Sequence, residues 1–117
     1  MRQLTSTDIA SFVAAKSVAA IHFDAEWDVS YRPIVRAKML EAERVLDEQA
    51  NFGEVDVDQN QKVAQAIRLL NIPAVAYYRG GKVVAVLHGA RQNICARIER
   101  LLRGELIGPK VAADESP

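Results

Sequence analysis

The residues best suited to chemistry follow one short apolar run near the N-terminus. Residues 18–23 have the length and composition of a buried strand, and the acids Asp24, Glu26 and Asp28 come soon after them. The next helix must begin close to Pro33, because a proline in a helix interior loses a hydrogen bond and clashes with the preceding turn. A strand end and a helix start therefore meet here, where unpaired N–H groups and the positive end of the helix dipole are available.

An acid/base or metal site could be built at this junction from His22 and the three acids after it. Histidine and carboxylates move protons near neutral pH or bind metal ions. Alternate strand residues point to opposite faces, however, which places His22 inside and spreads the acids around the strand end. The chain has no H-x-E-H spacing, cysteine pair or glycine-rich phosphate loop. We therefore expect no metal and no cofactor, and we interpret His22 as an interior histidine with satisfied hydrogen bonds.

Asp28 has a structural and a catalytic interpretation. Either Asp28 or Ser30 is in position to cap the helix that contains Pro33. A carboxylate at that place stabilises a helix by ~0.3–2 kcal/mol through capping and the helix dipole. The capping interpretation is favoured over a role for Asp28 in catalysis.

Composition limits the range of functions. The 117 residues are enough for one domain with a proper core, and 15 basic residues balance 15 acidic ones. A neutral chain gives no electrostatic reason to expect nucleic acid or an anionic membrane as a partner. No apolar run approaches the ~20 residues that span a bilayer, and no signal-peptide pattern is visible. With Cys95 as its single cysteine, the chain is expected to be cytoplasmic rather than disulfide-stapled.

Strand and helix patterns alternate along the chain. Strands are predicted at residues 1–5, 18–23, 52–57, 74–78 and 83–87, and helices at about residues 7–16, 31–46, 61–70 and 94–103. Strands separated by helices pair in parallel, whereas Gly80-Gly81 predicts a hairpin. We expect a three-layer α/β/α domain over residues 1–104, with a mixed sheet of four to five strands and about four helices, followed by a flexible tail at 105–117.

Two helical faces carry further expectations. In the second helix an apolar stripe recurs at helical spacing, with these members: Val35, Met39, Ala42 and Leu46. In the last helix the inward residues are predicted to be Ile94, Cys95, Ile98, Leu101 and Leu102. The arginines of that region are expected on a solvated face, namely Arg91, Arg97, Arg100 and Arg103.

Five short segments resemble one known family in order and spacing. The segment Ile21-His-Phe-Asp-Ala-Glu-Trp27 resembles the strand that leads into a thioredoxin active site, where Ala-Glu-Trp precedes Cys-Gly-Pro-Cys. The other matching segments are Val55–Asn60, Asn71–Ala74, Tyr78–Val83 and His88–Ala90. From about residue 4 to residue 104 the chain is thus similar to the thioredoxin family. The resemblance implies a thioredoxin-like fold and a cis peptide bond between Ile72 and Pro73.

The resemblance fails where the family keeps its catalytic cysteines. Asp28 and Tyr31 stand at those two positions, with Val29 and Ser30 in place of Gly-Pro. Disulfide exchange needs an attacking thiolate and a resolving thiol, so disulfide reductase activity is not expected. We interpret Tyr31 as a plug beside the Pro73 turn. Cys95 is expected to be a small buried hydrophobic residue of the last helix rather than a reactive thiol.

What the resemblance leaves intact is a peptide-binding groove. Its implied members are Trp27, Asp28, Val29, Ile72, Pro73, Ala74, Gly89 and Ala90. A groove of this kind holds an extended peptide partly through backbone hydrogen bonds, a form of strand addition that needs no sulfur. The alternative, that Trp27 is only a partly packed aromatic residue, stays open.

These observations support one hypothesis and two alternatives. The leading hypothesis is a redox-inactive thioredoxin-like protein that binds a protein or peptide partner as an adaptor or chaperone-like module. The first alternative is an enzyme, either a thioredoxin-related oxidoreductase acting through Cys95 or an enzyme with a site at Asp28 and His22. The second is a purely structural subunit.

Overall fold

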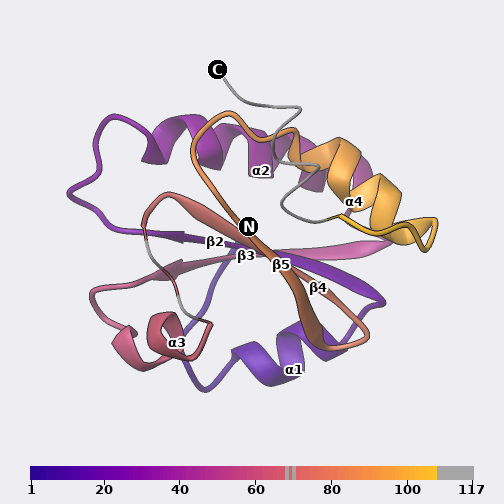
Figure 1. Cartoon of the computed structure of the whole chain (residues 1–117), viewed down its shortest axis with the longest axis horizontal. Helices are drawn as coiled ribbons and strands as arrows, with labels where there is room; N and C mark the ends of the chain where they lie inside the picture. Colours follow the sequence, from indigo (N-terminus) through magenta and orange to yellow (C-terminus); the bar gives the residue numbers. More distant parts are fainter. Residues whose placement is uncertain (68, 70, 108–117) are drawn as a thin grey trace.

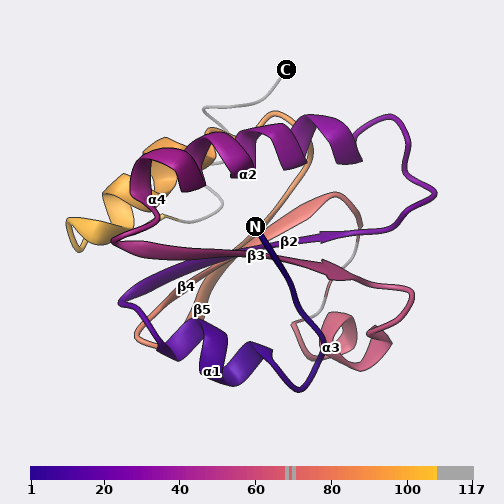
Figure 2. The ribbon, with the colours of Figure 1, turned by 180° about the vertical axis from the view of Figure 1, so that it is seen from behind.

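A mixed sheet of five strands lies between two pairs of helices. The computed structural model describes residues 1–67, 69 and 71–107. In chain order the elements are β1 (Arg2–Gln3), α1 (Ile9–Ala14), β2 (Val18–Asp24), α2 (Arg32–Leu46), β3 (Ala50–Asp56), α3 (Gln61–Ala66), β4 (Ala74–Arg79), β5 (Lys82–His88) and α4 (Ile94–Leu102). Helices α2 and α4 cover one face of the sheet, and α1 and α3 cover the other (Figures 1 and 2). The predicted three-layer α/β/α architecture is confirmed.

The sheet has the strand order β1-β3-β2-β4-β5. Strands β1, β3 and β2 run in parallel, whereas β4 is antiparallel to both β2 and β5. The two glycines between β4 and β5 have φ of 61° at Gly80 and 78° at Gly81. Positive φ at both positions suits the turn that joins two twisted strands, as the sequence predicted.

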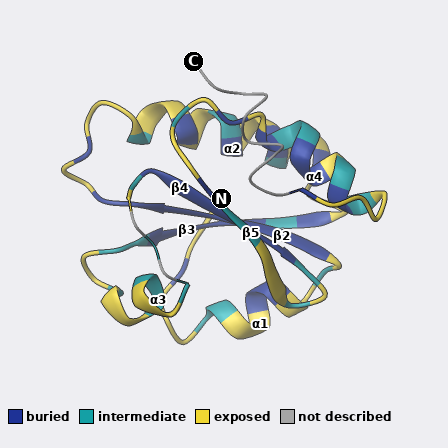
Figure 3. Ribbon diagram, in the orientation of Figure 1, coloured by how far each residue is buried: buried dark blue, intermediate teal, exposed yellow. Residues whose placement is uncertain are grey.

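Strand β2 is the centre of the domain, and all seven of its residues are buried. On the α2 and α4 side its neighbours include Phe52 and Tyr77, and on the other side they include Val55 and Phe12. Figure 3 shows the buried residues concentrated in the central strands and on the inner faces of the helices. The strand carries apolar residues on both faces because helices cover both faces, in contrast to the alternation of a half-exposed strand.

Helix α2 follows its predicted stripe. The residues that it buries are Val35, Met39, Ala42 and Leu46. Pro33 lies in the first turn, where its missing N–H has no intrahelical partner to lose.

Helix α4 differs from the prediction at three positions. Arg97, expected in solvent, is only 1% exposed, and Cys95 and Leu102, expected in the core, are half-buried. The residues that α4 buries are Ile94, Arg97, Ile98 and Leu101. Their spacing of three, one and three is that of a single inward stripe, so Cys95 falls about 100° away from its centre.

The segment after α4 returns to the domain. Ile107 is buried in the core between the sheet and the helices α2 and α4. Glu105 pairs with Arg103 at 2.6 Å and with Arg100 at 3.3 Å. The rest of the predicted tail, residues 108–117, lies outside the described residues. Among the helices of the described part, none has the length and apolar composition needed to cross a membrane.

Candidate functional site

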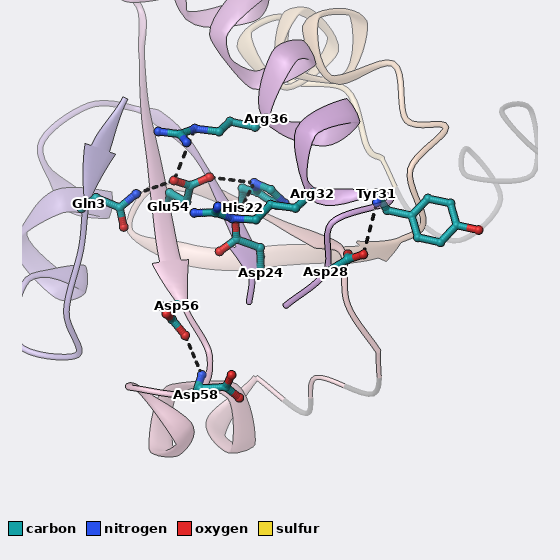
Figure 4. A network of polar contacts seen from close by, with 10 residues as sticks. All are labelled: Gln3, His22, Asp24, Asp28, Tyr31, Arg32, Arg36, Glu54, Asp56 and Asp58. Carbon is teal, nitrogen blue, oxygen red and sulfur yellow. Dashed lines mark hydrogen bonds and ion pairs between the residues drawn. The ribbon is translucent and has the colours of Figure 1, made fainter. Parts of the chain in front are cut away.

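The loop from β2 to α2 is shaped by Asp28. The Asp28 N–H donates to the Ala25 carbonyl at 3.1 Å, and the Asp28 carboxylate accepts the Tyr31 N–H at 3.2 Å (Figure 4). The residue that flanks the first turn of α2 is Tyr31. The helix therefore begins a few residues after the predicted N-cap positions Asp28 and Ser30. Asp28 nevertheless makes the contacts of a capping residue, because its carboxylate accepts the Tyr31 N–H and its carbonyl accepts the Arg32 N–H at 3.3 Å. It caps the turn that leads into α2.

Large apolar side chains of this loop are exposed. The exposed fractions are 65% for Trp27, 79% for Val29 and 54% for Tyr31. Ile34, in the first turn of α2, is exposed as well. The Trp27 indole N–H donates to the Asp58 carboxylate at 3.1 Å, which holds the ring against the segment before α3. A group of exposed large hydrophobic residues is more informative than a single one, since such groups mark binding surfaces.

Two shallow cavities meet beside this loop. The Pro73 cavity, of about 320 Å³, is lined by Tyr31, Asn71, Ile72, Pro73, His88, Gly89 and Ala90. The Trp27 pocket, of about 480 Å³, is lined by Trp27, Val57, Asp58, Gln61, Ala64, Gln65, Leu69, Asn71 and Ile72. Because Asn71 and Ile72 line both, the two cavities are adjacent parts of one surface. The peptide bond between Ile72 and Pro73 is cis.

The predicted groove residues divide into two groups. Those that line the two cavities are Trp27, Ile72, Pro73, Gly89 and Ala90. Of the others, Asp28 and Ala74 are buried and Val29 is exposed without lining either cavity. Tyr31 borders the Pro73 cavity instead of plugging it. Its side chain points away from the polar residues beneath the loop (Figure 4), so the space beside Pro73 stays open.

A second polar group lies beneath the loop, in the interior. Parallel pairing of β2 with β3 places His22 opposite Glu54. The His22 Nδ1 atom lies 3.2 Å from a Glu54 carboxylate oxygen and 3.7 Å from an Asp24 oxygen. All three side chains are almost completely buried. We refer to His22, Asp24 and Glu54 as the buried cluster (Figure 4).

Helix α2 supplies the positive charges of this region. The Arg32 guanidinium donates to Asp24 at 2.6 Å, and Arg36 lies 3.7 Å from Glu54. The Gln3 amide also donates to Glu54. Each buried carboxylate is thus paired with an arginine from the first two turns of α2, which makes the burial of two acids tolerable.

The environment separates the pKa values of the two acids. Burial alone would raise the pKa of Glu54, but the His22 hydrogen bond and the Arg36 charge outweigh it and lower the pKa to about 2. Burial is also the largest influence on Asp24, where it outweighs the Arg32 hydrogen bond and raises the pKa to about 6. Glu54 is therefore ionised at all ordinary pH values, whereas Asp24 holds its proton into the mildly acidic range.

The chemistry available to the buried cluster is limited. Ligand atoms of its three side chains lie within 4.8 Å of one another, so they could surround a metal ion. A metal ion would first have to displace Arg32 and Arg36 from the carboxylates, and no member of the cluster lines either cavity. Within the described residues, no hydrogen bond or ion pair joins His22 to Asp28. The geometry is that of a buried ion network.

Sequence reasoning missed Glu54 as a member of this network. It also placed the acids around the strand end, which is wrong for Asp24, because residues two apart in a strand share a face and Asp24 lies beside His22. The available signal was weak, because Glu54 lies in a strand segment where polar and apolar residues alternate. That Glu54 would lie opposite His22 depended on the β2–β3 register, which no local pattern specifies.

Cys95 lies in a third cavity, away from the loop. This cavity, of about 360 Å³, is lined by Lys38, Glu41, Arg91, Gln92, Asn93, Ile94 and Cys95. Partial burial, followed by the charges of Glu99 and Glu41, raises the pKa of the Cys95 thiol. A raised pKa keeps the thiol protonated and therefore weakly nucleophilic.

Comparison with known proteins places this geometry in a family context. The family model for thioredoxin matches residues 1–100. A mutant thioredoxin from Halobacterium salinarum has a similar structure, with a TM-score of 0.79 and 20% identity over 91% of this chain and 92% of that chain. A thioredoxin from Plasmodium falciparum has a TM-score of 0.72 and 20% identity over 89% of this chain and 98% of that chain.

A longer human protein is similar over part of its length. The zinc-bound form of human ERp44 has a TM-score of 0.75 and 23% identity over 87% of this chain, which corresponds to 32% of that chain. A search of curated proteins found no match to this chain. The structural neighbours establish a shared fold.

The buried cluster should make stability depend on pH in two opposite ways. The pKa of Glu54 is about 2 in the fold and ordinarily 4.5, so its stabilising effect is present above pH 4.5 and is lost as the pH falls toward 2. The pKa of Asp24 is about 6 in the fold and ordinarily 3.8, so stability falls as the pH rises from 3.8 to 6.

Urea denaturation from about pH 2 to pH 8 can separate the two effects. The stability difference between wild type and Glu54→Gln should shrink below pH 4.5, by roughly 3 kcal/mol at most. Asp24→Asn should lose less stability than wild type between pH 3.8 and 6. Glu48→Gln, an exposed carboxylate after α2, serves as the control and should follow wild type. Parallel curves for all four proteins would contradict the assigned pKa directions.

Alkylation should test the state of Cys95. With iodoacetamide at neutral pH, the native protein should react more slowly than the urea-unfolded protein, because the folded environment raises the thiol pKa. Glu99→Gln should accelerate the native reaction and leave the unfolded one unchanged, as measured by mass spectrometry. Native labelling faster than unfolded labelling would show that Cys95 is an activated thiol.

Proposed function

This chain belongs to the thioredoxin family, and we propose that it binds an extended segment of a protein or peptide without catalysing disulfide exchange. Its role is then that of an adaptor or a chaperone-like module. One observation carries the proposal: exposed apolar side chains gather where two cavities meet, beside the turn at Ile72 and Pro73.

Redox inactivity is supported by the residues at the end of β2. Disulfide exchange proceeds through a mixed disulfide and needs a second thiol to resolve it. The family resemblance places Asp28 and Tyr31 at the two cysteine positions, and Asp28 is occupied in closing a turn. The single cysteine of the chain, Cys95, lies on α4 and has a raised pKa. Neither an attacking thiolate nor a resolving thiol is available at the loop.

The exposed side chains supply the driving force for binding. Trp27, Val29 and Tyr31 are all more than half exposed, and covering apolar surface stabilises a complex by about 25 cal/mol per Å² before the costs of association. Tryptophan and tyrosine are the residues that most often dominate binding energy at interfaces. Both stand on a loop whose base is held by the buried cluster, so they need little ordering when a partner binds.

The backbone at Ile72 offers groups that can orient a bound peptide through hydrogen bonds. None of the hydrogen bonds among the described residues uses the N–H or C=O of Ile72, whereas the Pro73 carbonyl already accepts the Gly89 N–H at 3.0 Å. Strand β4 begins two residues later and has β2 and β5 on its two sides. An extended peptide that crosses the surface at Ile72 can therefore pair with unused backbone groups, as in strand addition.

The alternative enzymatic sites have less support. His22 is completely buried within its ion network, and Asp28 does not bond to it. Cys95 is separated from the loop surface and lines a different cavity. No observation favours catalysis at either place.

An insulin-reduction assay tests the first part of the proposal. With dithiothreitol as reductant, the protein should not accelerate the precipitation of insulin above the rate with dithiothreitol alone. A thioredoxin that has both cysteines serves as the positive control. Clear acceleration by the wild-type chain would overturn the claim of redox inactivity, and Cys95→Ser would then show whether Cys95 is responsible.

Binding to a permanently unfolded polypeptide tests the second part. Reduced and carboxymethylated lactalbumin offers extended segments without thiols, and isothermal titration calorimetry measures its affinity. Trp27→Ala should weaken binding about tenfold, the effect of losing one interface anchor of 1–2 kcal/mol. Its folding should be unaffected, since Trp27 is 65% exposed.

The matched control is Val45→Ala, which removes an exposed apolar side chain near the far end of α2. Its affinity should equal that of the wild type. Equal affinity of the Trp27→Ala variant would place binding elsewhere, and absence of binding by the wild type would reject the proposed function.

A further inference from the structure

The Trp27 pocket combines apolar walls with a free negative charge. Its walls include Val57, Ala64, Leu69 and Ile72, together with the indole of Trp27. The carboxylate of Asp58 stands at the same pocket and accepts the Trp27 N–H at 3.1 Å. The hydrogen bond fixes the acid beside the ring, so the pocket presents a carboxylate and an aromatic side chain together.

Acidic groups lie at and near this pocket without forming ion pairs among the described residues. The Asp58 N–H donates to the Asp56 carboxylate at 2.9 Å, which turns Asp56 toward Asp58 (Figure 4). Glu26 directly precedes Trp27 and is exposed. Over the part of the chain that the structure describes, none of these three acids forms an ion pair, not even with Lys62 on the adjacent α3. The Asp58 carboxylate at the pocket is therefore not paired with a cation of the described residues.

We propose that the Trp27 pocket binds a basic side chain, lysine or arginine, of the extended segment that occupies the groove. This inference rests on the proposed function and specifies which peptides the groove prefers. The aliphatic stem of the basic residue lies along the apolar walls, as such stems do on protein surfaces. Its cation meets the Asp58 carboxylate and the face of the Trp27 ring, which attracts cations through its quadrupole.

The same arrangement rejects the opposite charge. An acidic residue at that position would lie beside Asp58 with Asp56 nearby, and like charges at an interface oppose binding. A neutral residue of the same length keeps the apolar contacts and loses only the charge interactions. Lysine, norleucine and glutamate at one position of a peptide therefore separate the apolar and ionic contributions.

Trp27 itself reports on the pocket, because it is the only tryptophan of the chain. Three capped valine-rich peptides without aromatic residues, which differ only in lysine, norleucine or glutamate at the centre, are titrated against the full chain while its fluorescence is followed. The lysine peptide should bind about three- to tenfold more tightly than the norleucine peptide, as expected for one exposed ion pair with a cation–π contact. The glutamate peptide should bind most weakly, and high salt should reduce the differences.

Asp58→Asn tests the assignment of the charge. Asparagine keeps the shape and an oxygen that can accept the Trp27 N–H, so the norleucine affinity should not change while the preference for lysine disappears. Glu48→Gln removes the same charge at the other end of the domain, after α2, and should keep the preference.

The outcomes distinguish this inference from the proposed function. Equal binding of the lysine and norleucine peptides by the wild type would overturn the basic-residue pocket and leave the groove in place. A lysine preference that survives in Asp58→Asn would also overturn it, since the charge would act elsewhere. If none of the three peptides binds, and calorimetry with carboxymethylated lactalbumin also detects no binding, the proposed function fails and this inference fails with it.

Discussion

The structure depends on how one buried carboxylate is neutralised. Glu54 lies in the middle of β3, is almost inaccessible to solvent and has its pKa held near 2. A carboxylate in that environment is tolerated only when donors and positive charge surround it. An ionised carboxylate only accepts hydrogen bonds, so the His22 Nδ1 atom donates to it across the β2–β3 pair. A shift of the strands by one residue would turn these side chains to opposite faces.

The network also determines where α2 begins. Arg32 and Arg36 reach down from its first two turns to Asp24 and Glu54, so the helix start cannot move without leaving buried charge unpaired. Asp28 then closes the turn between β2 and the helix. The loop is held from below by ion pairs and from within by a turn, and its apolar side chains are left facing outward. The rigid base and the exposed Trp27 are two consequences of one arrangement.

The residues that stabilise the fold by ion pairing are therefore different from the residues that are exposed to a partner. The charged groups with strongly shifted pKa values are buried beneath the loop, whereas the groups that can meet a partner have ordinary surroundings at the surface. Perturbed acids often mark catalytic sites, but here the His22 hydrogen bond and the Arg36 charge explain the lowered pKa of Glu54, and burial explains the raised pKa of Asp24. A surface built from tryptophan, tyrosine and unused backbone groups supports the proposed binding, and the carboxylate fixed beside the tryptophan supports the proposed preference for a basic residue.

The sequence by itself determined the elements and their layering. The apolar run of β2, the stripe of α2 from Val35 to Leu46 and the Gly80-Gly81 turn are local patterns whose periods have a direct geometric meaning, and the structure has them where they were expected. Local patterns were less reliable at helix ends and edges. The extra turn before α2 moved its start beyond Asp28, and a rotation of α4 brought Arg97 inside and Cys95 to the margin.

Only the tertiary structure decided which residues meet across the sheet and across the loop. Glu54 joins His22 because two strands separated by α2 pair in one register, and Asp58 meets Trp27 because the segments after β2 and β3 end side by side. The residues of each pair are more than thirty positions apart in the chain. No periodicity spans such a distance, because contacts of this kind are selected by the packing of the whole domain rather than by the propensity of a segment.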